Sequence, residues 1–302
     1  MSMKSMKWLA PVLALLLLGS GLSRAGEKPV VRFGITAVVV RENLRFFDRF
    51  AGYLSRKLGR EVRFVRRKTY QEIMNLLDRQ ELEIAWICGY PFVQKRNASY
   101  ISLLVVPVYR GKQSYRSYII AHKNSRIDSI VDLRDKVFAY SDPDSNSGYL
   151  YPTFLLHSMG FESGDYFRKT FFTYNHAETV EAVAERVADG GAVDSYIWDF
   201  LRKANPALAL KTKIIHRSPE FGFPPIVARK TLPAALKGKI RTVLAKMHAD
   251  AQGRKLLDAL MLDGFTAASP GIYASIRNMH DELNSGRKTG LAKSGLEIVG
   301  RR

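Results

Sequence analysis

The sequence predicts an α/β protein with two lobes, each a mainly parallel sheet flanked by helices, and a ligand site in the cleft between the lobes. Short apolar runs of strand length alternate with amphipathic helical patterns along most of the chain, which is typical of sheets covered by helices. The chain has 302 residues, of which 46% are hydrophobic. This is too long for one typical core and supplies enough apolar material for two.

The elements of the first lobe begin with a strand at Val30–Ile35. A helix follows from about Glu42 to Leu58, because five apolar side chains recur there at helical spacing: Leu44, Phe47, Phe50, Leu54 and Leu58. The segments that complete this part are a strand at 62–65, a helix beginning near Tyr70 and a strand at 83–87.

A second set of alternating segments predicts the other lobe. Its expected strands are 118–121, 137–140, 170–174 and 194–197, and its expected helices begin at Ser147-Gly148 and at Ala177. A strand at 226–228 then returns to the first lobe, followed by helices at about 236–247 and 253–261.

These segments divide the chain into lobes. We expect lobe 1 to comprise residues 26–117 and 218–285 and lobe 2 residues 118–217, with hinges at the crossings near Ser117 and Ser218. Residues 286–302 are rich in Gly, Lys and Ser, so we expect a loosely held basic tail.

The N-terminus predicts export. Two lysines, Lys4 and Lys7, precede the apolar run 8–18, and small residues lead to Ala25, as in a secretory signal peptide cleaved near that residue. The apolar run is shorter than the roughly 20 residues that a membrane span needs. We therefore expect signal peptide 1–25 and a mature protein in the periplasm.

The chain is strongly basic. Its formal charge of +19 falls to +16 on cleavage, because the signal peptide carries Lys4, Lys7 and Arg24 and no acidic residue. An exported protein rarely meets nucleic acid, so we expect no nucleic-acid partner; the charge instead favours a small anion, an acidic partner or anionic lipid.

A group of hydroxyl and amide side chains indicates an anion site. Ser145, Asn146, Ser147 and Gly148 lie between the strand 137–140 and the next helix. Backbone N–H groups at a helix start lack intrahelical partners and attract anions, and glycine lets a ligand approach the backbone closely. An ordinary helix cap would use the same residue types.

Two further segments follow predicted strands and therefore border the same cleft. Cys88 and Gly89 follow the strand 83–87, and His176 opens the helix after the strand 170–174. Cys88 is the single cysteine, so the chain forms no internal disulfide, and the thiol is either buried and inert or exposed to a ligand.

Several segments resemble, in the same order, motifs of the phosphonate-type periplasmic substrate-binding proteins of ABC transporters, a branch of the type II periplasmic binding-protein fold. Asp132–Lys136 resembles the family's Asp-Leu-Lys/Arg-Gly-Lys stretch, and Asp142–Gly148 resembles its Asp-Pro-x-Ser-Thr-Ser-Gly signature. His176 resembles the histidine that opens the next helix, and Gly191–Asp194 resembles Gly-x-Val-Asp. The resemblance runs from about Val31 to Met279.

The resemblance implies which residues bind the ligand. From lobe 2 it implies that Ser145, Asn146, Ser147 and Gly148 hold oxyanion oxygens and that His176 donates a hydrogen bond. From lobe 1 it implies two tyrosines. The full set is Tyr70, Tyr115, Ser145, Asn146, Ser147, Gly148 and His176, with Cys88, Trp86 and Tyr196 as further possible contacts.

The chain also departs from the family's pattern. Asn146 stands where threonine is common, and Pro224 stands where members that bind aminoalkyl phosphonates place a carboxylate for the amine. Asp199 and Glu220 are the other acids that could meet an amine. We therefore expect a small oxyanion without an amine, such as phosphate, phosphite or a compact phosphonate.

Three functions remain to be separated. The first is a monomeric transport receptor that closes on an oxyanion and docks on a membrane ABC permease. The second is a sensor of the same fold that binds an oxyanion, or arsenite through Cys88, and signals to a histidine kinase. The third, an enzyme, is not expected, because no metal-ligand spacing or Ser-His-acid pattern is present, and we expect no cofactor and no metal.

Overall fold

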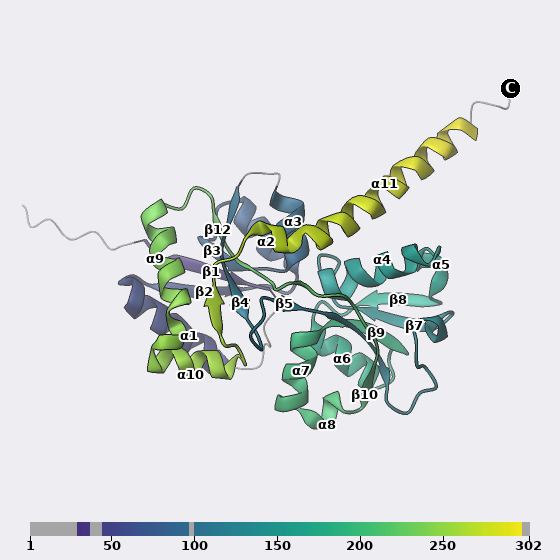
Figure 1. The fold of residues 1–302 in the computed structure, drawn as a ribbon, viewed down its shortest axis with the longest axis horizontal. Coiled ribbons are helices and arrows are strands. Elements are labelled where there is room, and N and C mark those ends of the chain that lie inside the picture. The colour runs from purple at the N-terminus through teal and green to yellow at the C-terminus, as the bar shows by residue number, and fades with distance from the viewer. Residues whose placement is uncertain (1–28, 37–43, 97–99, 298–302) are drawn as a thin grey trace, which may run out of the picture.

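The computed structural model describes residues 29–36, 44–96 and 100–297, which form two α/β lobes joined by two chain crossings (Figure 1). The predicted signal peptide, residues 1–25, lies outside the described residues. Within the described part of the chain, no helix is long and apolar enough to span a bilayer.

Lobe 1 is built on a six-stranded sheet in the order β13-β4-β12-β3-β1-β2. Strands β1, β2 and β3 pair in parallel, but β12 is antiparallel to β3 and β4, and β13 is antiparallel to β4. The sheet is mixed rather than mainly parallel, because the two strands that form after the chain returns from lobe 2 run against the first four. The strands are β1 (Val31–Ile35), β2 (Val62–Arg66), β3 (Ile84–Trp86), β4 (Ile101–Val108), β12 (Ile226–Arg229) and β13 (Gly264–Thr266).

Among the described residues of this lobe, four helices contact the sheet, a fifth packs against the first of them, and a sixth leaves the lobe. In α1, the predicted apolar face is buried at Phe47, Phe50, Leu54 and Leu58. The ring of Phe50 packs 5.4 Å from that of Phe64 on β2, which holds the helix against the sheet. The helices are α1 (Leu44–Leu58), α2 (Tyr70–Asp78), α3 (Gly89–Arg96), α9 (Ala234–Ala245), α10 (Ala251–Ala259) and α11 (Ala274–Glu297), with short 3₁₀ turns at Met247–Ala249 (η3) and Pro270–Tyr273 (η4).

Lobe 2 has a five-stranded sheet in the order β10-β6-β9-β7-β8. Strand β7 is parallel to β8 and β9, whereas β6, which brings the chain into the lobe, runs against both neighbours. The strands are β6 (Ser117–His122), β7 (Val137–Tyr140), β8 (Lys169–Phe172), β9 (Gly190–Asp194) and β10 (Thr212–Arg217). The helical segments are η1 (Val131–Leu133), η2 (Asn146–Leu150), α4 (Tyr151–Ser158), α5 (Ser163–Tyr166), α6 (His176–Ala184), α7 (Ser195–Ala204) and α8 (Pro206–Ala209).

The strand predicted at 194–197 is wrong, because the strand ends at Asp194 and helix α7 begins at the next residue. A side-chain oxygen of Asp194 accepts the backbone N–H of Tyr196 at 2.7 Å, which is a helix N-cap. The apolar run Tyr196–Trp198 is therefore the buried start of a helix rather than a strand.

The two crossings predicted near Ser117 and Ser218 lie beside each other. The N–H of Ser117 donates to Ser218 Oγ at 2.8 Å, and the N–H of Ser218 donates to the carbonyl of Ser117 at 3.0 Å. Just on the lobe 1 side, β5 (Ser114–Tyr115) and β11 (Phe221–Gly222) pair as a short antiparallel ribbon. The lobes are thus connected by two adjacent strands.

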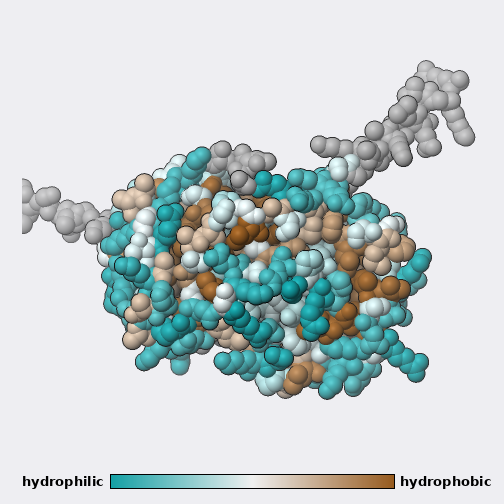
Figure 2. Space-filling model, in the orientation of Figure 1, coloured by the Kyte–Doolittle hydropathy of each residue, from teal (hydrophilic) through white to brown (hydrophobic). Residues whose placement is uncertain are grey.

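The C-terminal tail predicted from residue 286 is instead a continuation of α11 as far as Glu297. This helix starts in lobe 1, contacts α3, and then contacts η2 and α4 of lobe 2 before it projects from the body (Figure 1). Hydrophilic side chains cover most of the face drawn in Figure 2, with smaller hydrophobic areas between them.

We expect Phe50→Ala to lower the free energy of unfolding by about 3–5 kcal/mol, because the ring is buried between α1 and the sheet. Urea denaturation would measure the change. Val187→Ala is a suitable control, since that side chain is 63% exposed and should change stability by less than about 0.5 kcal/mol. Equal midpoints for the two variants would contradict the packing described here.

Candidate functional site

The lobe 2 side of the site is the turn that follows β7. Ser145 caps a single π-helical turn, η2, by accepting the N–H of Gly148 at 2.9 Å through its hydroxyl. Gly148 is required here, because a Cβ would lie 2.5 Å from the Cβ of Ser141. Ser145, Asn146 and Ser147 are all fully buried, as an enclosed cradle requires.

Lobe 1 contributes three residues that touch this cradle. The Asn146 Nδ2 group donates to the hydroxyl of Tyr115 on β5 at 3.0 Å, and the Asn146 backbone N–H donates to Cys88 Sγ at 3.3 Å. Tyr70, the first residue of α2, places its hydroxyl 3.4 Å from His176 Nε2. All three lobe 1 side chains are buried, so the lobes are closed on each other.

His176 is positioned as a neutral hydrogen-bond donor. Asn175 caps the start of α6, and His176 Nδ1 accepts the backbone N–H of Asp194 at 3.2 Å. A neutral ring that accepts at Nδ1 carries its proton on Nε2, which faces Tyr70 and lies 3.5 Å from Ser145 Oγ. Burial lowers the pKa of His176 to about 3, so the ring stays neutral at physiological pH.

Two buried polar atoms of the cradle have no hydrogen-bond partner within the described protein: Ser147 Oγ and Asn146 Oδ1. Buried polar atoms are almost always paired, because leaving one unpaired costs about 1–3 kcal/mol. Both atoms belong to residues for which the family resemblance implies ligand binding. A small polar ligand bound between the lobes would satisfy them.

Two buried carboxyl groups lie beside the cradle. Asp142 accepts the N–H of Tyr70 at 3.2 Å from across the cleft, and the N–H of Asp144 at 2.8 Å. Burial raises the pKa of Asp142 to about 6 and, through the same desolvation, that of the cap residue Asp194 to about 8. The Tyr70 contact makes Asp142 a link between lobe 2 and the N-terminus of α2.

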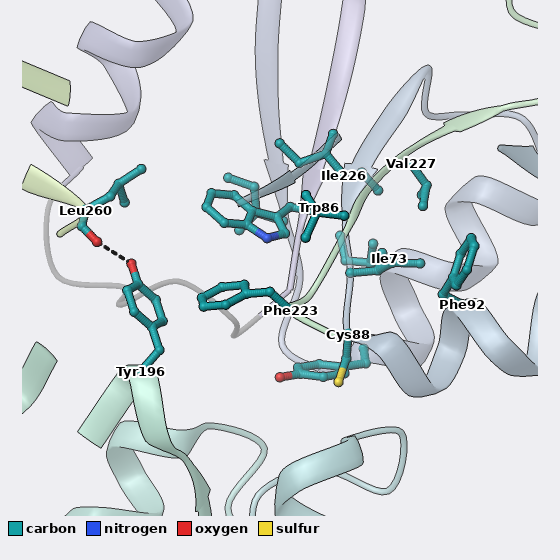
Figure 3. Packing of buried hydrophobic residues seen from close by; sticks show 14 of the residues in the cluster. Ile73, Trp86, Cys88, Phe92, Tyr196, Phe223, Ile226, Val227 and Leu260 are labelled. Atoms are coloured by element: carbon teal, nitrogen blue, oxygen red, sulfur yellow. Dashed lines mark hydrogen bonds between the residues drawn. The ribbon is translucent and has the colours of Figure 1, made fainter. Parts of the chain in front are cut away.

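An aromatic cluster adjoins Tyr115. The ring of Phe223 lies 5.7 Å from that of Tyr115 and 5.3 Å from that of Tyr196, and Tyr109 lies 5.2 Å from Tyr196. Figure 3 shows Phe223 next to Tyr196, whose hydroxyl donates to the carbonyl of Leu260 at 2.6 Å. The rings fill the junction between the lobes next to the cradle.

The polar groups of Trp86 and Tyr196 both donate to backbone carbonyls, so neither offers a free polar group to the cradle. The indole N–H of Trp86 donates to the carbonyl of Pro224 at 3.0 Å, and the Tyr196 hydroxyl is bonded to Leu260. Trp86 packs within lobe 1, next to Phe265, and Tyr196 packs between the lobes. Cys88 does reach the cradle, but burial raises its pKa to about 11, which disfavours the thiolate that a soft metalloid would need.

The two acids considered for an amine are engaged elsewhere. Asp199 accepts the hydroxyl of Tyr109 at 3.0 Å and pairs with Arg110 at 3.0 Å. Glu220 pairs at the crossings with Lys112 at 2.7 Å and with Arg116 at 3.2 Å.

Ser117, Asp142 and Asp194 were missed as parts of the site. Ser117 donates its hydroxyl to the carbonyl of Ser147 at 2.7 Å and so connects the crossing to the cradle. Asp142 and Asp194 lie inside two of the family motifs, but the resemblance assigned ligand contacts to other residues. Their hydrogen bonds join segments far apart in the sequence. The available signal for Asp142 was its position two residues after the predicted strand 137–140, whereas Asp194 was placed at the start of a predicted strand.

Comparison with known proteins identifies the family of the chain. Residues 33–273 match the family model described as the phosphonate ABC transporter periplasmic substrate-binding protein. The chain belongs to this family. Its fold is that of type II periplasmic binding proteins, and the family is a substrate-binding component of transporters rather than an enzyme.

Two curated relatives are moderately similar. The chain is 26% identical over 261 residues to the phosphonates-binding periplasmic protein of Escherichia coli (strain K12), covering 84% of this chain and 76% of that protein. It is 23% identical over 250 residues to the "Probable ABC transporter phosphite binding protein PhnD1" of Prochlorococcus marinus (strain MIT 9301), covering 79% and 84%.

Two solved structures have the same fold. The binding-protein component of an ABC phosphonate transporter from Pseudomonas aeruginosa superposes with a TM-score of 0.77 at 25% identity, covering 83% of this chain and 85% of that chain. PhnD1 from Prochlorococcus marinus in complex with methylphosphonate gives a TM-score of 0.75 at 22% identity, covering 84% and 98%.

We expect Ser147→Ala to weaken oxyanion binding by roughly 1.5–3 kcal/mol, because it removes a charge-assisted hydrogen bond in an enclosed site. Titration calorimetry with phosphite or methylphosphonate would measure the loss. Stability without added ligand should change much less, since Ser145 and not Ser147 caps the turn. Unchanged affinity would remove Ser147 from the site.

We expect Cys88→Ser to leave oxyanion affinity within a few-fold, because serine keeps an acceptor for the Asn146 N–H and a thiol donates only weakly. The same calorimetry applies, with arsenite as a second ligand. Loss of arsenite binding in this variant, with phosphorus oxyanions inert towards the unmodified protein, would instead support a metalloid sensor.

Proposed function

We propose that this protein is the periplasmic receptor for a compact phosphorus oxyanion, such as phosphite, phosphate or methylphosphonate, and delivers it to an ABC permease by closing its two lobes. Proteins of this family bind a small ligand and interact with a membrane permease. The family model is described as periplasmic and one curated relative is named a periplasmic protein, which supports this compartment. The choice of ligand and the closing motion are our inferences from the site.

The observation that best supports this proposal is that neutral polar side chains from both lobes gather in one site, and that two buried atoms of this site have no hydrogen-bond partner. Tyr70 and Tyr115 come from lobe 1, and Ser145 and His176 come from lobe 2. Ser147 Oγ and Asn146 Oδ1 lack partners within the described residues. Such an array of fixed dipoles suits a small anion that accepts hydrogen bonds on several oxygens.

The surroundings favour a small ligand without an amine. Pro224 presents a carbonyl to Trp86, and Asp199 and Glu220 are held in ion pairs away from the cradle. The rings of Tyr115, Tyr196 and Phe223 pack together where a substituent would need space. An aminoalkyl chain would therefore lack room, and neither Asp199 nor Glu220 would be free to pair with its amine.

A thermal-shift panel tests the proposal. Phosphite, phosphate and methylphosphonate should raise the melting temperature, because a ligand that binds only the folded protein stabilises it by about 2.7 kcal/mol at a hundred times its Kd. 2-Aminoethylphosphonate should give a much smaller shift. A strong shift with the aminophosphonate alone would contradict the compact-ligand proposal, and no shift with any of them would contradict the function.

Small-angle scattering tests the motion. A saturating compact oxyanion should reduce the radius of gyration, because contacts from both lobes stabilise the closed arrangement. Ser147→Ala at the same ligand concentration is the matched control and should stay less closed. Identical profiles with and without a bound ligand would argue against hinge closure.

A further inference from the structure

We propose that Asn146 makes the site selective for the monoanionic form of its oxyanion, a form that carries an O–H group able to donate to Asn146 Oδ1. This inference rests on the proposed function and deepens it. It concerns a residue at which the chain departs from the usual signature of its family.

The first argument is the orientation of the Asn146 amide. Its Nδ2 group donates to the Tyr115 hydroxyl at 3.0 Å, so Oδ1 points away from that hydroxyl. Oδ1 is buried and has no partner among the described residues. A carbonyl oxygen only accepts hydrogen bonds, so the ligand atom that satisfies it must carry a proton. A fully deprotonated oxygen placed there would be repelled.

The second argument is the charge around the cradle. In the part of the chain that the structure describes, no lysine or arginine makes a hydrogen bond or ion pair with the side chains of Tyr70, Tyr115, Ser145, Asn146, Ser147 or His176. Two buried carboxyl groups, Asp142 and Asp194, lie beside them instead. Removing two negative charges from water costs more than removing one, so this neutral and partly acidic site favours a monoanion.

The third argument is the chemistry of the candidate ligands. A phosphoryl group loses its second proton not far from neutral pH, at about 6 in a phosphate monoester. Both forms of such a ligand are therefore present under ordinary conditions, and a receptor can choose between them. Sulfate and sulfonates carry no proton at these pH values. One buried acceptor would thus also exclude them.

Protein groups near the ligand also titrate. They are the same whichever ligand is bound, so their effect can be distinguished from that of the ligand's own proton. They are Tyr70 on α2, Cys88 after β3, Tyr115 on β5, Asp142 after β7, His176 on α6, Asp194 at the start of α7 and Tyr273 on η4. A midpoint caused by any of them would be the same for all ligands. A midpoint caused by the ligand's own proton would move with the ligand.

Calorimetry on the unmodified protein from pH 5 to pH 9 is the decisive experiment. Affinity for phosphite and for methylphosphonate should fall about tenfold per pH unit above each ligand's own second pKa. The fall should begin at lower pH for phosphite, the stronger acid. Methanesulfonate has the shape and charge of hydrogen methylphosphonate but no O–H, and should bind about tenfold to a hundredfold more weakly at pH 5.

Two variants assign the effect to Asn146. Asn146→Thr replaces the acceptor with a hydroxyl that can turn and donate, so the preference for hydrogen methylphosphonate over methanesulfonate should shrink to within a few-fold. Ser147→Ala is the matched control: it should weaken both ligands alike and leave the pH midpoints in place. Thermal melts of both variants would show that they are folded.

The outcomes separate this inference from the proposed function. Equal binding of methanesulfonate, a flat pH profile, or one common midpoint for both phosphorus ligands would overturn the role of Asn146 and leave the receptor function intact. Failure of folded protein to bind any of the phosphorus oxyanions across the pH range would overturn the function and the inference together.

Discussion

The hydrogen bonds of Ser117 connect the two chain crossings between the lobes with the cradle. Its N–H and carbonyl both bond to Ser218, so the two crossings form one connected unit. Its hydroxyl bonds to the carbonyl of Ser147, at 2.7 Å, inside the cradle. Because Ser117 is fully buried, these bonds do not compete with water. A rotation at the crossings must therefore also move the cradle.

The site and the protein surface use charge in opposite ways. The mature chain is expected to carry a formal charge of +16, which raises the local concentration of small anions around the protein. Within the cradle, by contrast, the ligand meets hydroxyls, an amide and a neutral imidazole, whose pKa is lowered by burial. Attraction at long range and selection at short range are therefore carried by different residues.

Much of the fold and the cradle could be predicted because the signals are local. The alternation of strands and helices located both lobes, and the run Ser145–Gly148 is contiguous in the sequence. The partners that close the cleft are not local: Tyr70 contacts His176, and Tyr115 contacts Asn146, only after the whole chain has folded. Tyr70 and Tyr115 were named through resemblance to a family rather than through their own surroundings.

The wrong strand prediction has the same origin. A short apolar run such as Tyr196–Trp198 fits a strand as well as a buried helix start, and the cap formed by Asp194 decides between them. The sequence pattern predicted that Trp86 and Tyr196 lie near the cleft. It could not predict that their polar atoms donate to the backbone carbonyls of Pro224 and Leu260, which lie far along the chain.

The balance between open and closed lobes follows from the pairing of buried groups. Closure gains bonds between the lobes, such as that from the Tyr70 N–H to Asp142, but it also removes Ser147 Oγ and Asn146 Oδ1 from water without giving them protein partners. At about 1–3 kcal/mol for each unpaired atom, this cost is comparable to the gain from the bonds between the lobes. A ligand that bonds to both atoms removes the cost in the closed arrangement only, and such a difference in affinity between two states is what makes closure depend on ligand.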